Sequence, residues 1–302
     1  MTDMENAYKA LAEAIEDNAQ RVENALALCS QGTDEDYGLI FDAERYSLLG
    51  GGKRVRPFLV NETCRILGGD IECSMPLACA VEMIHTYSLI HDDLPCMDDD
   101  DVRRGKPSSH KAFGYANALL AGDALLTRAF LVIAEAQSLD GETRAEAVRI
   151  LAHAAGERGM IGGQIMDLIG ETQELEFETL LKLHSHKTAA LMEGSVLLGA
   201  LAAGYRYDSD ETKALCEYAR KIGVAFQVID DVLDMTASET TLGKSVGSDA
   251  GHNKTTFLTY YDVDSARKYA ETLTADAISA VSRIEGSERL TDFACYLLNR
   301  EK

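Results

Sequence analysis

Hydrophobic residues recur along the chain with the three-to-four-residue spacing of amphipathic helices. Leu11, Ile15, Val22 and Leu26 form one such stripe near the start. The stretches ALLAGDALLTRAFLVIAEA and SVLLGALAAG are apolar on nearly every side, which predicts helices buried inside a large bundle. No set of alternating strands with hairpin turns is visible. The pattern predicts helices over residues 4–29, 35–49, 54–67, 76–93, 111–138, 142–159, 174–204, 209–236, 263–284 and 288–299.

The connections between these helices are short except for residues 94–110 and 237–256. Both long connections are polar, and each follows a cluster of aspartates. No low-complexity linker or shift in composition divides the chain. We therefore expect an all-α fold in a single domain that spans residues 1–302.

Charge narrows the range of partners. The 302 residues include 50 Asp and Glu against 29 Lys and Arg, a net charge of -21. Such a surface repels the phosphates of nucleic acid, so we expect no nucleic-acid partner. The N-terminal segment is acidic and amphipathic, unlike a signal peptide, and the longest uncharged apolar stretch, Gly194 to Tyr205, is shorter than the ~20 residues that span a bilayer. We expect no membrane span and a cytoplasmic protein.

The seven cysteines are scattered, odd in number and free of any C-x-x-C pair. This distribution suggests neither a disulfide framework nor a zinc site. It predicts buried, reduced thiols in a reducing compartment.

The first aspartate cluster lies in HDDLPCMDDDDVRRGK. Pro95 should end the preceding helix near Leu94, which leaves Asp92 and Asp93 in its last turn. Carboxylates there face the negative end of the helix dipole and repel each other. Either solvent or a cation must offset this repulsion.

The second cluster, FQVIDDVLD, contains Asp230, Asp231 and Asp234. Residues 230 and 234 lie one helical turn apart on one face, separated by ~6 Å along the axis. A single acidic run is explained by a solvated loop, but two runs on apolar helices, both followed by basic residues, favour metal ions. Magnesium takes oxygen ligands and completes its shell with substrate phosphates. A calcium-binding EF-hand loop does not fit, because Val102 and Arg103 break its pattern.

Basic residues gather at a few places against this acidic background. GGKRVRP places Lys53, Arg54 and Arg56 in a glycine turn before a helix, which suits a phosphate, although a solvated basic turn is the alternative. His85 lies two helical turns before Asp92, where a lone histidine is usually structural. The remaining candidates follow the first aspartate run or lie in or after later helices: Arg103, Arg104, Lys187, Lys244 and Lys254.

Two carboxylate clusters, two basic groups and an apolar helical interior together suit the ionisation of an allylic diphosphate. Magnesium ions draw charge from the leaving diphosphate as the carbon–oxygen bond breaks. An apolar pocket holds the hydrocarbon and excludes the water that would quench a carbocation.

The motifs GGKRVRP, HDDLPCMDDDDVRRGKP, GGQIMDL, HSHKTAAL, FQVIDDVLD and LGKSVGSD occur in this order. In this respect the chain resembles the trans-isoprenyl diphosphate synthases, and most closely the bacterial farnesyl and geranylgeranyl type, over roughly residues 35 to 300. The resemblance implies an all-α bundle of the isoprenoid synthase type with a deep central cavity. It also implies a homodimer, three magnesium ions per active site, and diphosphate substrates.

The resemblance also implies roles for individual positions. Magnesium would be held by Asp92, Asp98 and Asp230, with Asp93, Asp231 and Asp234 nearby. The allylic diphosphate would contact Arg103, Lys187 and Lys244, with assistance from Lys254. Isopentenyl diphosphate would contact Lys53, Arg56, His85 and Arg104. Thr188 and Gln227 would present oxygens to the developing cation, and the released diphosphate would act as the base after ionisation and condensation.

Product length is expected to depend on the residues upstream of Asp92. One helical turn rises ~5.4 Å, comparable with one extended isoprene unit. Reading back from Asp92, Ser88 lies at four positions, Tyr87 at five and Ile84 at eight. In the resembling family an aromatic residue at the place of Tyr87 favours the fifteen-carbon product, so we expect farnesyl diphosphate.

Four alternatives stay open at this point. Tyr87 could point into the core, and the product could be geranylgeranyl diphosphate. A terpene cyclase is less consistent with the intact second aspartate motif. A non-catalytic subunit of a heteromeric prenyltransferase would be expected to have lost one motif, and both are present.

Overall fold

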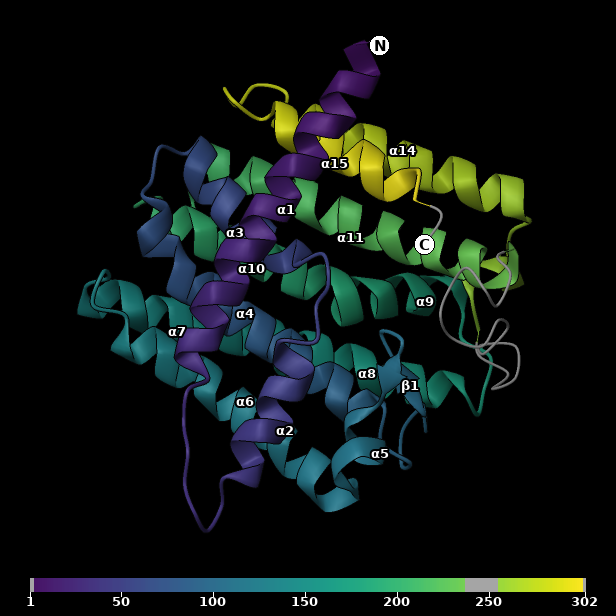
Figure 1. Cartoon of the computed structure of the whole chain (residues 1–302). Helices are drawn as coiled ribbons and strands as arrows, with labels where there is room; N and C mark the ends of the chain where they lie inside the picture. The colour runs from purple at the N-terminus through teal and green to yellow at the C-terminus, as the bar shows by residue number, and fades with distance from the viewer. Residues whose placement is uncertain (1–2, 237–254, 301–302) are drawn as a thin grey trace.

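The computed structural model describes residues 3–236 and 255–300, and it confirms the predicted all-α architecture (Figure 1). Helices make up 74% of the structure. In order, the elements of the described chain are α1 Asp3–Cys29, α2 Leu39–Leu48, α3 Val55–Ile66, α4 Ile71–Asp92, β1 Val102–Arg103, β2 Lys106–Pro107, α5 Ser109–Phe113, α6 Tyr115–Glu135, α7 Gly141–Ala155, α8 Met160–Gly170, α9 Phe177–His184, η1 Ser185–Ala189, α10 Ala190–Ala202, α11 Asp210–Thr236, η2 Phe257–Thr259, α14 Val263–Val281 and α15 Glu288–Leu298.

Helices α4 and α10 lie at the centre of the bundle. α4 packs against α1, α2, α3, α6, α7 and α10, and α10 also packs against α11 (Figure 1). One buried cluster joins α4, α6, α7 and α10, and a second joins α3, α11, α14 and α15. A helix covered on several sides must be apolar nearly all round, as the sequence of α4 is.

Several predicted boundaries were wrong, each for a local reason. α4 begins five residues before Pro76, because Asp70 caps it by accepting a hydrogen bond from the backbone N–H of Glu72 at 3.0 Å. The predicted helix 111–138 divides into α5 and α6 at Gly114, whose φ of 87° lies in the left-handed region. The predicted helix 174–204 is also interrupted, by the π-helical turn η1.

Helix α8 was missed by the sequence prediction. It contains Gly162, Gly163 and Gly170, and glycine is a poor helix former. Tertiary packing outweighs that preference, because a Cβ on Gly163 would lie 2.2 Å from the backbone nitrogen of Lys187. Only a glycine permits α8 to approach η1 this closely.

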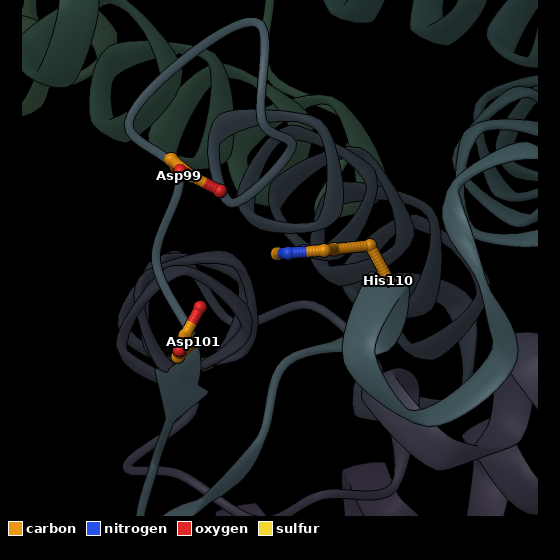
Figure 2. A group of neighbouring side chains, drawn as sticks. All are labelled: Asp99, Asp101 and His110. Carbon is orange, nitrogen blue, oxygen red and sulfur yellow. The ribbon is translucent and has the colours of Figure 1, made fainter.

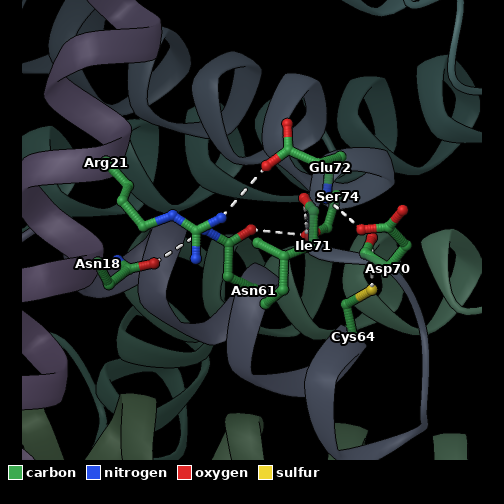
Figure 3. A network of polar contacts seen from close by, with 8 residues as sticks. All are labelled: Asn18, Arg21, Asn61, Cys64, Asp70, Ile71, Glu72 and Ser74. Atoms are coloured by element: carbon green, nitrogen blue, oxygen red, sulfur yellow. Dashed lines mark hydrogen bonds and ion pairs between the residues drawn. The ribbon is translucent and has the colours of Figure 1, made fainter.

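A polar network ties α1 to the start of the central helices (Figure 3). The buried side chain of Asn61 on α3 donates to Asn18 on α1 at 2.8 Å and accepts from Ser74 on α4 at 2.7 Å. Arg21 on α1 reaches Glu72 on α4 at 3.3 Å. These bonds satisfy a buried amide and fix the position of α4, the helix that carries the first aspartate pair.

Helix α6 is apolar and 21 residues long, which by length and composition alone would suffice to span a membrane. It packs against α2, α4, α5 and α7, yet one side remains exposed. That side carries Tyr115, Leu119, Leu120 and Leu131, of which Leu120 is 54% exposed.

All seven cysteines are free thiols. Cys64, Cys79 and Cys216 are buried as expected, whereas Cys96 is exposed in the loop after α4. Cys29, Cys73 and Cys295 are only partly buried, so the expectation of burial holds fully for three thiols and was wrong for Cys96.

Candidate active site

The first aspartate motif closes a loop at the C-terminal end of α4. Asp92 is the last residue of the helix, and the backbone N–H of Asp98 donates to the carbonyl of Asp92 at 2.9 Å, which returns the chain to its starting point. Burial raises the pKa of the Asp92 carboxyl to about 6; Lys187 opposes this shift, and the negative charge of Asp98 adds to it. A carboxylate held in this way gains from a nearby cation.

Asp93, unlike Asp92, is paired with an arginine side chain. It is buried and accepts a hydrogen bond from Nε of Arg103 at 2.9 Å and a second from Nη2. Arg103 also reaches Asp100 at 3.3 Å. Asp93 therefore anchors the guanidinium of Arg103.

A short hairpin positions Arg103 and Arg104. Strands β1 and β2 pair with Arg103 opposite Lys106, and the two-residue turn is made by Arg104 and Gly105, both with positive φ. Arg104 donates to the carbonyl of Gly51 in the glycine turn. A Cβ on Gly52 would lie 3.0 Å from Cζ of Arg104, so the glycine turn and the hairpin are in direct contact.

Positive side chains converge around His85. Burial, then the charges of Arg56, Arg104, Arg54 and Arg103, lower the pKa of His85 well below its usual value. These surroundings favour the neutral imidazole, which can still donate a hydrogen bond to a phosphate. Burial also lowers the pKa of Arg56 to about 10, which still leaves it charged at neutral pH.

The other basic residues of the glycine turn point elsewhere. Arg54 is buried and pairs with Glu82 at 2.5 Å and with Glu23 at 3.2 Å, so it links α1, α3 and α4. Lys53 is exposed, with its Nζ 5.2 Å from the centre of the Tyr296 ring.

The π-helical turn η1 presents Lys187 and Thr188. π-bulges often mark functional positions within helices. Nζ of Lys187 donates to Asp167 on α8 at 2.6 Å, and the hydroxyl of Thr188 hydrogen-bonds Gln227 on α11. Because Lys187 also acts on Asp92, η1 connects the end of α4 with the part of α11 that carries the second motif.

The three aspartates of the second motif differ in their partners. Asp230 pairs with Arg300 at 2.6 Å. Asp231 is buried and accepts a hydrogen bond from the backbone N–H of Phe257 at 2.6 Å, so it fixes η2. Asp234 is 5% exposed, and its Oδ1 has no hydrogen-bond partner among the described residues. An orphaned buried carboxylate oxygen is costly unless a cation or water meets it.

The polyprenyl synthetase family model matches residues 39–289 of the chain. The chain belongs to this family. Its activity class is that of the trans-prenyltransferases. The family resemblance seen in the sequence is thereby confirmed.

Individual relatives agree on the family and differ in their products. The chain is 49% identical over 244 residues to the large subunit 1 of the heterodimeric geranylgeranyl pyrophosphate synthase of Arabidopsis thaliana, covering 79% of this chain and 65% of the relative. It is 50% identical over 220 residues to the farnesyl diphosphate synthase of Geobacillus stearothermophilus, covering 71% and 72%. It is 44% identical over 264 residues to a geranylgeranyl diphosphate synthase of Cyanophora paradoxa, covering 86% and 87%.

Solved structures show the same fold. An FPP/GFPP synthase from Zymomonas mobilis superposes with a TM-score of 0.86 at 38% identity, covering 96% of this chain and 99% of the other. A geranyltransferase from Helicobacter pylori, solved with magnesium and isoprenyl diphosphate, gives a TM-score of 0.83 at 32% identity and 94% coverage of both chains.

The carboxylates of this family member suit magnesium. The aspartates of the two motifs offer oxygen donors, and burial raises the pKa of Asp92. Oδ1 of Asp234 is buried and has no partner in the described part of the chain. Asp92, Asp98, Asp230 and Asp234 are the residues that could hold the ions. Lys244 and Lys254, which the family resemblance would place at the diphosphates, lie outside the described residues.

Two site residues were not assigned from the sequence. Asp167 lies in the GGQIMDL motif, which could have identified it, because a conspicuous acidic residue there follows an apolar run. Arg300 gave no signal, since its contact with Asp230 joins residues 70 apart. A metal ion on Asp230 would compete with this guanidinium.

The substitution Gly163→Ala is expected to destabilise the site. The new Cβ would lie 2.2 Å from N and 2.5 Å from Cα of Lys187, and backbone atoms cannot rotate away. We expect a loss of about 1–3 kcal/mol in the free energy of unfolding and a fall in turnover. Urea unfolding and steady-state kinetics measure both. Gly141→Ala is the matched control, since its Cβ meets nothing within 4 Å, and equal effects of the two substitutions would contradict the packing argument.

Proposed function

We propose that the chain is a farnesyl diphosphate synthase that extends dimethylallyl and then geranyl diphosphate with isopentenyl diphosphate. Tyr87 carries this proposal. It is 5% exposed and packs edge-on against His91, with ring centres 5.7 Å apart. Burial and the charge of Asp92 raise its pKa to about 12, so the ring lies within electrostatic reach of the first motif. A bulky ring fixed there would stop the growing tail.

The basic residues would divide between the two substrates. We propose that Arg103 and Lys187 bind the allylic diphosphate, with Lys244 and Lys254. Arg56, Arg104, His85 and Lys53 would bind isopentenyl diphosphate. Asp93 would keep Arg103 in place, as its two hydrogen bonds to that guanidinium support.

The reaction would then proceed in three steps. The allylic carbon–oxygen bond breaks, and its electron pair leaves with the diphosphate. The double bond of isopentenyl diphosphate forms the new carbon–carbon bond, and the released diphosphate removes a proton. Magnesium ions, proposed to number three, supply the charge that stabilises the leaving diphosphate. The hydrogen-bonded pair Thr188 and Gln227 would present oxygen atoms to the cation.

Starter specificity tests the proposed product. Purified protein is incubated with magnesium, isopentenyl diphosphate and one starter at a time: dimethylallyl, geranyl or farnesyl diphosphate. The proposal expects consumption of the first two and little or none of the third. Efficient use of farnesyl diphosphate would make the chain a geranylgeranyl diphosphate synthase, the product in the names of most relatives. No consumption of any starter would favour a non-catalytic subunit.

We also propose that α6 forms the interface of a homodimer. Tyr115, Leu119, Leu120 and Leu131 are exposed apolar side chains on this helix, and the exposed Asp123 lies among them. A two-fold axis would place this side against its own copy and remove both from water. We further propose a cytoplasmic location, with no nucleic-acid partner and no membrane span.

Charge on the exposed side of α6 is expected to separate the subunits. The double variant Leu120→Glu, Leu131→Glu would bury two carboxylates per chain at the interface, at a cost that no pairing offsets. Light scattering is expected to give the mass of two chains for the natural protein and one for the variant. Leu28→Glu is the control, because Leu28 is 68% exposed on α1. A natural protein with the mass of one chain would refute the homodimer. An assembly that forms only with a different subunit would refute it as well and indicate a heteromeric enzyme.

A further inference from the structure

Three ligand-type side chains meet at the end of the first aspartate motif, beside the proposed magnesium ligands. Asp99, Asp101 and His110 each offer one atom, and these atoms lie within 4.8 Å of one another (Figure 2). The two aspartates lie in the loop between α4 and β1, and His110 lies in α5. Neither the magnesium ligands nor the diphosphate contacts proposed above include any of them.

His110 is buried with one ring nitrogen unused. Its side chain is 7% exposed, and Nδ1 lies 3.1 Å from Oγ of Ser108. Nε2 has no hydrogen-bond partner among the described residues. Figure 2 shows the ring extending from α5 into the space between Asp99 and Asp101. A buried imidazole nitrogen that faces two carboxylates without a partner is costly unless something binds there.

We propose that Asp99, Asp101 and His110 form a second cation site, selective for a divalent transition metal such as Zn²⁺. A mixed nitrogen and oxygen donor set favours such a metal over magnesium, which prefers oxygen alone. Three protein ligands leave a fourth position for water. Ser108 would orient the imidazole of His110. If its Oγ accepts a hydrogen bond from Nδ1–H, the lone pair of Nε2 is left for the metal.

This site uses other side chains than the one at Asp92. Lys187 acts on Asp92, whereas Asp101 pairs with Lys111 of α5 at 2.7 Å. The ammonium of Lys111 therefore sits beside the proposed site, where it would compete with a metal ion for Asp101. Its removal should tighten metal binding.

A metal here would fasten the β1–β2 hairpin at its base. The backbone N–H of Ser108 donates to the carbonyl of Asp101 at 2.9 Å, so the ligands stand on both sides of the hairpin that carries Arg103 and Arg104. A metal ion that binds the folded chain but not the unfolded chain would stabilise the folded chain by mass action. The inference does not depend on the proposed function, because it concerns binding to residues outside the catalytic groups.

Metal titration of the purified full chain tests the proposal. Zn²⁺ is titrated calorimetrically with saturating Mg²⁺ present, and Co²⁺ absorption reports whether nitrogen and oxygen ligands surround the ion. We expect one Zn²⁺ that Mg²⁺ does not displace. Binding should weaken at least about tenfold in His110→Gln and in Asp101→Asn. It should tighten in Lys111→Ala.

His153→Gln is the matched control, because His153 is an exposed histidine outside this group. Its zinc affinity should equal that of the natural chain. Circular dichroism without metal establishes that the variants fold. The proposal is overturned if natural chain and folded His110→Gln take up zinc with equal affinity, or if Mg²⁺ displaces the bound Zn²⁺.

Discussion

Turnover is expected to fall by about 10²–10³-fold or more when Asp92 or Asp230 is replaced by alanine, with the helical fold retained. Each substitution removes a carboxylate proposed to hold magnesium against the leaving diphosphate. The loss should appear in kcat at saturating substrate. Asp92→Asn keeps the shape and removes the charge, so it should lose nearly as much as Asp92→Ala.

The fold should tolerate these changes. Burial raises the pKa of Asp92, so its charge is no asset to the metal-free fold. Arg300 loses its pair in Asp230→Ala, but it still donates to the carbonyl of Phe226 at 2.9 Å and stacks on that ring. Far-ultraviolet circular dichroism checks the helix content, and Asp17→Ala, at an exposed position of α1, is the control. Near-normal turnover in both active-site variants would refute the metal assignment.

Product length is expected to increase from fifteen to twenty carbons in Tyr87→Ala. Removing the ring opens a space about one helical turn and a half from Asp92, room for one more isoprene unit. Tyr87→Phe should keep the fifteen-carbon product, because the phenol oxygen has no hydrogen-bond partner among the described residues and only the ring blocks the tail. Mass spectrometry of the diphosphate products measures both.

Ile84→Ala separates the two possible positions of the block. Ile84 is fully buried one turn further from Asp92. With Tyr87 in place, the tail should stop before it, and the product should not change. If Tyr87→Ala leaves the product unchanged while Ile84→Ala or Ser88→Ala lengthens it, the limit lies at those positions and Tyr87 belongs to the core.

The sequence was sufficient for the helical architecture because hydrophobic periodicity records which face of each helix is buried. It failed where backbone contact between distant segments decides the structure. Helix α8 depends on Gly163 lying against η1, and η1 itself is a π-helical turn that no local preference indicates. Gly163 and Lys187 are far apart in the sequence, and no local pattern shows that they touch.

The candidate site was predictable to a similar degree. The aspartate motifs and Lys187 were identified as candidates by residue type and order, and Thr188 and Gln227 only through the family resemblance. In the structure Lys187 acts on Asp92, and Thr188 hydrogen-bonds Gln227. The sequence could not tell that Asp93 and Asp231 hold neighbouring groups while Asp234 keeps an unpartnered oxygen. Identical carboxylates in one motif acquire different partners only through tertiary packing.

The central claim is that this chain alone makes a fifteen-carbon prenyl diphosphate with the help of metal ions. The most direct test is to incubate the purified protein with dimethylallyl and isopentenyl diphosphates plus magnesium, and to size the products by mass spectrometry, with a parallel sample in a chelator. The account predicts farnesyl diphosphate as the main product and none in the chelator. A twenty-carbon main product would contradict the role of Tyr87, and no product with magnesium present would contradict the assigned activity.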